Sequence, residues 1–307
     1  MAVARVHSSD SQVFVNEGGE AFETFRLPLL QSLSISTSKD FTDLQPLGKY
    51  CYTDRILNSN QTPTMELSHL VSTGVSGFSL DDGGYPFYAL QDQARRLLSI
   101  ESYKFMARDN AGQTLISGAY PVSYELRGSV GDVVSATTKY DADTVTFNAD
   151  HPLDSTDDFP QDLLANLPVF RPQNISITTN NTPFVRDKLP TEAMDSASLN
   201  IQDFTLSATV SREPKTRIGS RIPSFRYPTL PANGTLNFSV IKNQVTGINM
   251  ANLVLDKGAI TIDLQDNEGN STMDFVTSGC SLESVSESLG IEGNETMDFS
   301  YIFSIQY

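Results

Sequence analysis

Met297-Asp298-Phe299-Ser300-Tyr301-Ile302-Phe303-Ser304-Ile305-Gln306-Tyr307 is a run in which every second side chain is apolar or aromatic. Because successive side chains of a β-strand point to opposite faces, this run predicts one long, half-buried strand. The same alternation occurs in residues 206–210 and 260–264, with Ser, Thr or Asp at the alternate positions. Such polar faces are typical of antiparallel sheets with one wetted side. The sequence therefore predicts an all-β protein.

Helical periodicity is pronounced in only two segments, so the helical content is expected to be minor. In residues 88–98, Leu90, Ala94 and Leu97 fall on one face of a helix, and Leu98 extends that face. In residues 246–258, Thr246 would cap a short helix and Gly258 would end it. Each predicted helix follows one predicted strand and precedes another.

The predicted elements recur along the chain in one order, which indicates an internal repeat. Residues 33–40 align with residues 206–213 at an offset of 173, and residues 64–70 align with residues 235–241 at an offset of 171. The two helices follow, and then an Asp-Asn-x-Gly turn at 109–112 and again at 266–269. We interpret this order as a duplicated module. The alternative is a chance similarity between β-rich segments.

The repeat divides the chain into four parts. Residues 1–27 are predicted to be an N-terminal arm, either disordered or ordered by a neighbour, and residues 28–150 the first β domain. Residues 151–199 carry six prolines and are expected to form an extended connector with one strand near 174–178. Residues 200–307 form the second β domain. Each domain is predicted to carry one helix beside its strands.

Composition and charge narrow the classes of function. The chain has 307 residues, 39% of them hydrophobic and 19% charged, which is typical of a globular protein. The net charge of -16 disfavours wrapping of nucleic acid, because phosphate binding needs cations, and it equally suits a protein that simply stays soluble. No segment has the roughly 20 apolar residues of a membrane span, and the N-terminus lacks an apolar signal region. A cytoplasmic site of synthesis is therefore expected.

Catalytic and metal-binding motifs are not evident in the sequence. His7, His69 and His151 lack a neighbouring arrangement that would build a nucleophile and base, and His69 lies in a predicted strand. The two cysteines, Cys51 and Cys280, lie far apart and show no metal-type spacing. We therefore expect no enzymatic activity, no cofactor and no metal.

One cationic segment stands out on this acidic chain. Residues 212–226 carry five cations and a single anion. We interpret this segment as a docking site for acidic copies of the same chain. The alternative is a solvated loop whose arginines pair locally. The second predicted contact is the Gly-rich loop at 74–86. The predicted contact residues are Arg212, Lys215, Arg217, Arg221 and Arg226 in the cationic segment and Asp81 and Asp82 in the Gly-rich loop.

With these features in place, the chain resembles the tail tube proteins of tailed bacteriophages, in the subgroup with two tandem tube domains. The likeness rests on the order of the elements and on the segments LQSLSIS at 30–36 and TMELSHL at 64–70. It covers most of the chain from about Pro28 onward and lies at the level of topology.

The resemblance implies that each domain is a β-sandwich or half-barrel with one flanking helix. It also implies that neighbouring domains join sheets edge to edge into an inner β-barrel. Two-domain chains would form trimeric, pseudo-hexameric rings, and stacked rings would make a conduit for DNA. The acidic charge fits a lumen along which DNA slides. The implied partners are the chain itself, other tail proteins and passing DNA that is not tightly bound, with no membrane. The implied location is the virion tail, with assembly in the host cytoplasm.

Two other classes of function are compatible with the same observations. One is a different virion part built on the same domain, such as a tail terminator, a baseplate ring or a capsid decoration protein. The other is a secreted carbohydrate-binding β-sandwich.

Overall fold

The fold is an antiparallel β-structure, which confirms the predicted fold class. Every pairing between the described strands is antiparallel. The structure is a computed structural model that describes residues 12–17, 30–38, 41–44, 54–57, 62–71, 97–98, 102–109, 112–148, 175–180, 201–218, 222–223, 225–241, 258–265, 271–288 and 296–305.

The strands fall into two series. The first series is β1 (Gln12–Glu17), β2 (Leu30–Ser38), β3 (Phe41–Leu44), β4 (Asp54–Leu57), β5 (Thr62–Leu70), β6 (Tyr103–Asp109), β7 (Gly112–Ser129), β8 (Ser135–Asp141) and β9 (Thr144–Asn148). The second is β10 (Ile175–Asn180), β11 (Ile201–Thr209), β12 (Arg212–Lys215), β13 (Phe225–Pro228), β14 (Asn233–Ile241), β15 (Gly258–Gln265), β16 (Ser271–Ser288) and β17 (Thr296–Ser304). We call these series the first half and the second half.

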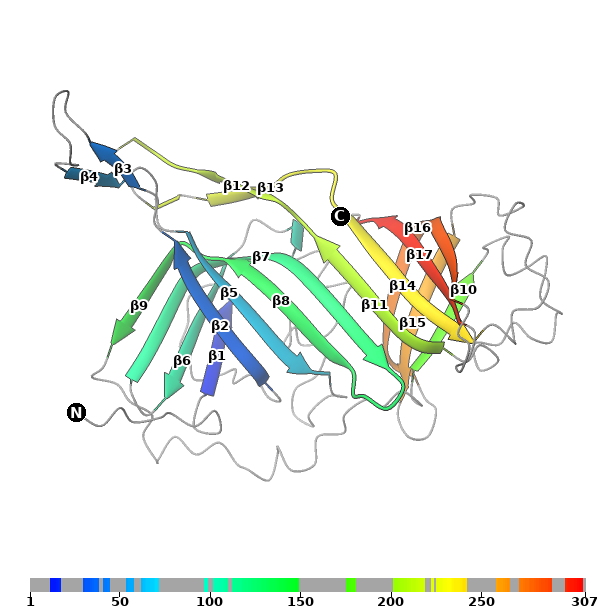
Figure 1. The fold of residues 1–307 in the computed structure, drawn as a ribbon. Coiled ribbons are helices and arrows are strands. Elements are labelled where there is room, and N and C mark those ends of the chain that lie inside the picture. Colours follow the sequence, from blue (N-terminus) through cyan, green and yellow to red (C-terminus); the bar gives the residue numbers. More distant parts are fainter. Residues whose placement is uncertain are drawn as a thin grey trace.

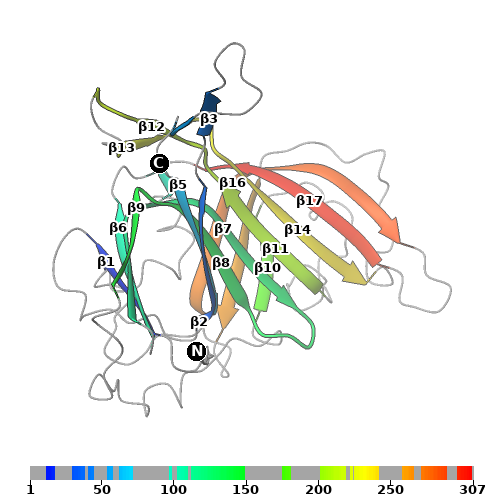
Figure 2. The same cartoon turned by 60° about the vertical axis from the view of Figure 1, so that its left-hand side comes forward.

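The two halves repeat one pairing pattern. Strands pair in the order β2-β5-β8-β7 in the first half and β11-β14-β17-β16 in the second. In each half the long strand continues into a second layer, which is β7-β6-β1 in the first half and β16-β15-β10 in the second. A separate two-stranded hairpin, β3–β4 or β12–β13, is inserted between the first two strands of the main sheet. Figures 1 and 2 show the main sheet running through both halves.

A positive-φ glycine marks the point where each long strand changes layer. Gly118 in β7 has a φ of 65° and Gly279 in β16 has a φ of 66°. Directly beyond them, β7 pairs with β8 from Tyr120 onward and β16 pairs with β17 from Ser281 onward. Left-handed backbone costs a residue with a Cβ about 1–2 kcal/mol, which explains glycine at both bends. The bend lets one strand serve both layers of a sandwich.

The register of the strands repeats as well. The hydroxyls of Ser36 and Thr64 lie 2.6 Å apart across β2 and β5, and those of Ser207 and Thr235, each 171 residues further on, lie 2.8 Å apart across β11 and β14. Beyond the bends the offset is 161. Tyr140 of β8 and Tyr301 of β17 are both buried and are 161 residues apart. Tyr140 pairs with β5 and β7 at the same register at which Tyr301 pairs with β14 and β16.

One predicted alignment is wrong by two residues. Leu33 lies opposite Leu67, and Phe204 lies opposite Phe238. These pairs give β2 and β11 an offset of 171, in place of the predicted 173. A shift of two residues leaves every side chain on its own face of a strand, so alternation in the sequence could not detect the error.

The other predicted elements can be compared with the structure segment by segment. Residues 12–17 were placed in the arm, but they form β1, which pairs with β6 and buries Val13 to 2% exposure. A strand predicted near 174–178 is confirmed as β10. Of the first predicted helix, the structure describes Leu97 and Leu98, which are helical and buried. The second predicted helix lies outside the described residues, as do loop 74–86 and turn 266–269.

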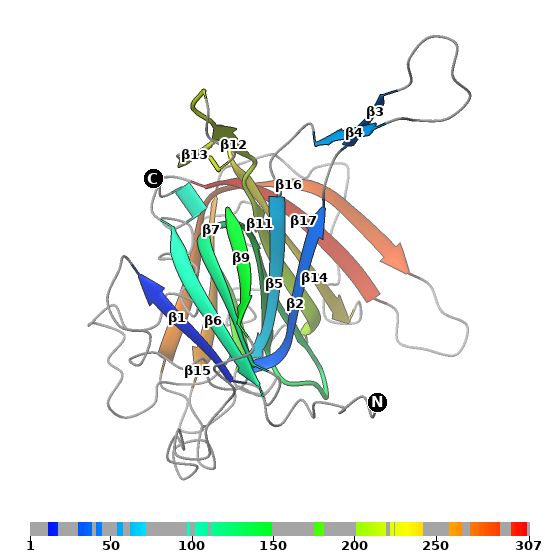
Figure 3. The ribbon, with the colours of Figure 1, turned by 90° about the vertical axis from the view of Figure 1, so that its left-hand side faces the viewer.

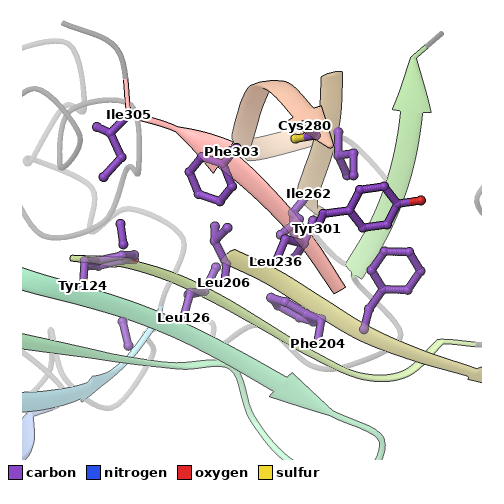
Figure 4. Packing of buried hydrophobic residues seen from close by; sticks show 14 of the residues in the cluster. Tyr124, Leu126, Phe204, Leu206, Leu236, Ile262, Cys280, Tyr301, Phe303 and Ile305 are labelled. Carbon is purple, nitrogen blue, oxygen red and sulfur yellow. The ribbon is translucent and has the colours of Figure 1, made fainter. Parts of the chain in front are cut away.

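Two hydrophobic cores lie between the layers. The first lies in the first half, where Phe105 and Ile116 of one layer pack with Met65 and Leu67 of the other. The larger core crosses from one half to the other. It joins Tyr124, Leu126 and Val134 of the first half to Phe204, Leu206, Leu236, Ile262, Tyr301 and Phe303 of the second half (Figure 4). The halves therefore share one core.

Candidate assembly edges and polar sheet face

The two halves are joined by the antiparallel pair β7·β11. In this joint Leu206 lies opposite Leu126, and Ser207 lies opposite Glu125. The backbone ladder extends past the strand ends, where Val210 N donates to Val122 O at 2.8 Å. This joint combines the two four-stranded units into one eight-stranded sheet. Leu126 and Leu206 are completely buried in it.

The outer edges of this sheet are the counterparts of the strands in the joint. β2 corresponds to β11, and the C-terminal part of β16, residues 281–288, corresponds to β7. Among the described residues β2 pairs only with β5, and residues 281–288 pair only with β17. Each edge therefore presents backbone N–H and C=O groups of the kind that the β7·β11 joint satisfies.

Apolar side chains at these edges are less buried than their counterparts in the joint. Ile35 of β2 is half-buried, whereas its counterpart Leu206 is 0% exposed. Val285 of β16 is half-buried, whereas its counterpart Tyr124 is 0% exposed. A second strand laid along either edge would cover these side chains, as β7 and β11 cover each other.

Charged residues also mark the β16 edge. Glu283 and Glu287 are exposed there, and Glu287 stands where β7 has the buried Leu126. Charges on an edge strand discourage indiscriminate pairing with other chains. They limit the partners of this edge to a strand that tolerates carboxylates.

The face of the eight-stranded sheet that points away from the core is rich in hydroxyl groups. Its side chains alternate with those of the core, and all those described are exposed or half-buried except Ser239, which is 7% exposed. Cross-strand hydroxyl contacts recur on it, including Thr137 Oγ1 donating to Ser68 Oγ at 3.4 Å. The hydroxyl and amide residues on this face include Ser34, Ser36, Thr64, Ser68, Ser123, Thr137, Thr205, Ser207, Thr235, Asn237, Ser284, Ser286 and Ser300.

Carboxylates outnumber cations on this polar face. Lys139 pairs with Glu66 at 3.2 Å, and Arg127 pairs with Glu125. Among the described residues of this face, the other charged side chains away from the β12–β13 hairpin are Asp203, Glu283 and Asp298. Burial first, and then the negative charge of Asp298, raises the pKa of Asp203. The face is therefore polar and net negative.

The β12–β13 hairpin of the second half is anchored to the first half by Arg226. This side chain is 2% exposed, and its Nε donates to Asp143 Oδ1 at 3.0 Å. Its Nη2 donates to Ala142 O at 3.1 Å, and Nη1 lies 3.8 Å from Asp141 Oδ2. Burial raises the pKa of both carboxyls, and the Arg226 charge opposes that shift.

Arg212 is a second anchor of this hairpin. Its Nε donates to Pro121 O at 2.9 Å and its Nη2 to Leu97 O at 2.6 Å. Its guanidinium carbon lies 5.4 Å from the centre of the Tyr120 ring. Burial lowers the pKa of Arg212 to about 10, so the side chain is still cationic at neutral pH.

The predicted contact residues therefore occupy different environments. Arg212 and Arg226 bind groups of their own chain, as expected if the arginines of this segment pair locally. A further contact of either arginine with a neighbouring chain stays a prediction. Lys215 is exposed and pairs with Glu213 at 2.7 Å, and Arg217 is exposed. Arg221, Asp81 and Asp82 lie outside the described residues.

Neither the partners of the two buried arginines nor the free sheet edges were predicted from the sequence. Asp141 and Asp143, which flank the hairpin's anchor point, were not predicted to contact it. Their spacing of two residues, which places both on one side of the chain, was the available signal. The edges follow from strand order, which alternation does not encode.

Comparison with known proteins adds no assignment. No protein-family model matches the chain, and no match was found among curated proteins. Within the described part of the chain, no three metal-ligating side chains gather at one point, and no helix has the length and apolar character to cross a membrane.

Proposed function

We propose that this protein is a structural subunit that assembles head to tail through β16 of one chain and β2 of the next, and that the resulting rings stack into the tail tube of a bacteriophage. A single observation carries the proposal. The two free edges of the main sheet are the repeat counterparts of β7 and β11, which already pair inside the chain.

Repetition of this joint favours a closed ring. A head-to-tail interface closes when each contact turns the next unit by a fixed fraction of a circle, and otherwise it builds a filament. Because the joint between chains would copy the joint between halves, every half would see the same surroundings. Three chains would then give a ring of six similar units, and the edges would disappear into a continuous barrel.

The polar face would line the channel of such a ring. The core face of the sheet is covered by the second layers, β1-β6-β7-β9 and β10-β15-β16, and no described strand lies over the polar face. A closed sheet has more room on its outer side for these layers and for the hairpins. Its inner side would carry hydroxyls and excess carboxylates, which repel DNA phosphates and let DNA pass without sticking.

Electron microscopy of the purified full-length protein tests this proposal. We expect rings with a central channel, and tubes of stacked rings at higher concentration. A protein that stays monomeric by light scattering at all concentrations would contradict the proposal.

A single-ring role is the second candidate. Both sheet edges specify how a ring closes, and neither specifies how rings stack. A baseplate ring or tail terminator would use the same edges. Isolated rings that never stack at high protein concentration would favour this second role.

A further inference from the structure

The β3–β4 hairpin is the counterpart of the anchored β12–β13 hairpin. Both are inserted between the first two strands of their half. Asp43 lies opposite Arg55 in one, and Pro214 lies opposite Arg226 in the other, so all positions correspond at the offset of 171. Arg55 therefore occupies the register position of the buried Arg226.

The two hairpins differ in what lies beneath them. β12–β13 lies over the first half, whose β7 is joined to β11. Among the described residues β3 and β4 pair only with each other, and Figures 1 and 3 show them projecting beyond the main sheet. The unit that would lie beneath β3–β4 is the second half of whichever chain joins its β16 to β2.

We propose that the β3–β4 hairpin docks on the second half of the neighbouring chain, and that Arg55 lies over the segment from Ile302 to Ser304. This inference rests on the proposed head-to-tail assembly and names the second contact of that interface. The docking surface follows from the anchor point of Arg226, because Asp141, Ala142 and Asp143 correspond to Ile302, Phe303 and Ser304 at the offset of 161.

The acidic residue near the arginine has a different position in the two hairpins. Within the chain, Arg226 lies opposite Pro214 and takes its carboxylates from the receiving surface. Between chains, the receiving surface has Ile302 and Ser304 in their place, while Asp43 lies directly opposite Arg55 on the same hairpin. Directly opposed residues of a β-ladder share a face of the sheet. The hairpin that lacks acidic partners on its target therefore carries one itself.

The receiving surface of the second half is also open. A Cβ at Gly118 would lie 2.8 Å from Asp143 Cβ, whereas a Cβ at Gly279 would meet nothing within 4 Å. Gly279 is exposed. No described residue therefore fills, beside Gly279, the space that Asp143 fills beside Gly118.

The residues at the second anchor position also differ between the two halves. Phe41 stands at the register position of Arg212, and Ser281 stands at that of Tyr120. Within the chain a cation covers an aromatic ring. Between chains the aromatic residue is on the hairpin and the small residue is on the receiving strand.

Charge substitution at the two predicted contact positions tests the proposal. Ser304→Lys, at an exposed position, and Arg55→Glu should each raise the protein concentration needed for half-maximal ring formation by about tenfold, because each places a repulsive or unmatched charge in the contact. The double variant places Glu opposite Lys and should restore assembly. Thr146→Lys, at an exposed position of β9, is the matched control and should assemble as the unmodified protein does.

A gain-of-contact variant makes the test independent of folding defects. Ser304→Asp restores the carboxylate that Arg226 has in Asp143, so it should make assembly more resistant to dilution. Single variants that assemble like the unmodified protein, a double variant that shows no recovery, or Ser304→Asp without effect would each overturn the hairpin docking. If the unmodified protein forms no rings at all, the proposed function itself fails.

Discussion

Arg226 Nε donates to Asp143 Oδ1 across 3.0 Å, and this contact ties a hairpin of the second half to the first half. The arginine is 2% exposed and the aspartate side chain 12% exposed, so both charges are largely removed from water. A buried charge without its partner is strongly destabilising, by about 3–5 kcal/mol. The two halves are therefore joined by electrostatics as well as by the sheet and the shared core.

Asp143→Ala should lower the free energy of unfolding by about 3 kcal/mol, because it removes the nearer of the two carboxylates that pair with the buried Arg226 and leaves the more distant Asp141. Chemical denaturation measures this loss. Lys215→Ala is the matched control, since its pair with Glu213 is exposed and should contribute less than about 1 kcal/mol. Equal effects of the two substitutions would show that Arg226 does not depend on Asp143.

Gly118→Ala should destabilise the protein more than Gly279→Ala. Both substitutions place a Cβ on left-handed backbone, which costs about 1–2 kcal/mol. Only at Gly118 does the new Cβ also overlap Asp143 and push it from Arg226. Thermal unfolding of the two variants compares them directly. A larger loss for Gly279→Ala would contradict the described bend of β7.

His69 should make the protein less stable as the pH falls. It is 6% exposed in β5, and burial lowers its pKa to about 4, from 6.5 in the unfolded chain. Between these two values the unfolded chain binds a proton that the folded chain does not. Protonation of His69 therefore does not affect the free energy of unfolding above pH 6.5. Between pH 6.5 and pH 4 it lowers that free energy, by at most about 3 kcal/mol.

Denaturation of the protein and of His69→Leu across this pH range separates the His69 effect from other titrations. Asp141 and Asp143, whose pKa values are raised by burial, are present in both proteins and contribute equally. The difference in unfolding free energy between the two proteins should change between pH 6.5 and 4 and be flat above. A constant difference would show that His69 titrates as in the unfolded chain.

The sequence predicted the strands well because alternation is a local property. β17 and β11 follow directly from every second residue being apolar, and burial of Phe299, Tyr301 and Phe303 confirms the face that was predicted. β1 was missed because it has only six residues, and Val13 is the one side chain in it that is described as buried. Such a segment is too short to show a clear alternation of apolar and polar residues.

The candidate site was less predictable because it depends on which strands become neighbours. Arg212 and Arg226 were found as cations, but their burial depends on β7, on Leu97 and on the segment after β8, which lie about a hundred residues away in the chain. The free edges β2 and β16 look like any other strands in the sequence. Only the order of strands in the sheet separates an edge from a centre.

Disulfide trapping across the proposed β16·β2 joint tests the head-to-tail assembly most directly. In the joint within the chain, Ser207 lies opposite Glu125, and their counterparts at the free edges are Ser36 and Ser286. With Cys51→Ser as background and the buried Cys280 retained, Ser36→Cys with Ser286→Cys should form covalent oligomers between chains under mild oxidation. Ser32→Cys with Ser286→Cys, displaced by four residues, should form none. Efficient linkage of the first pair alone, ending at a closed oligomer, is the predicted result; no linkage in assembled particles, or equal linkage of both pairs, would contradict it.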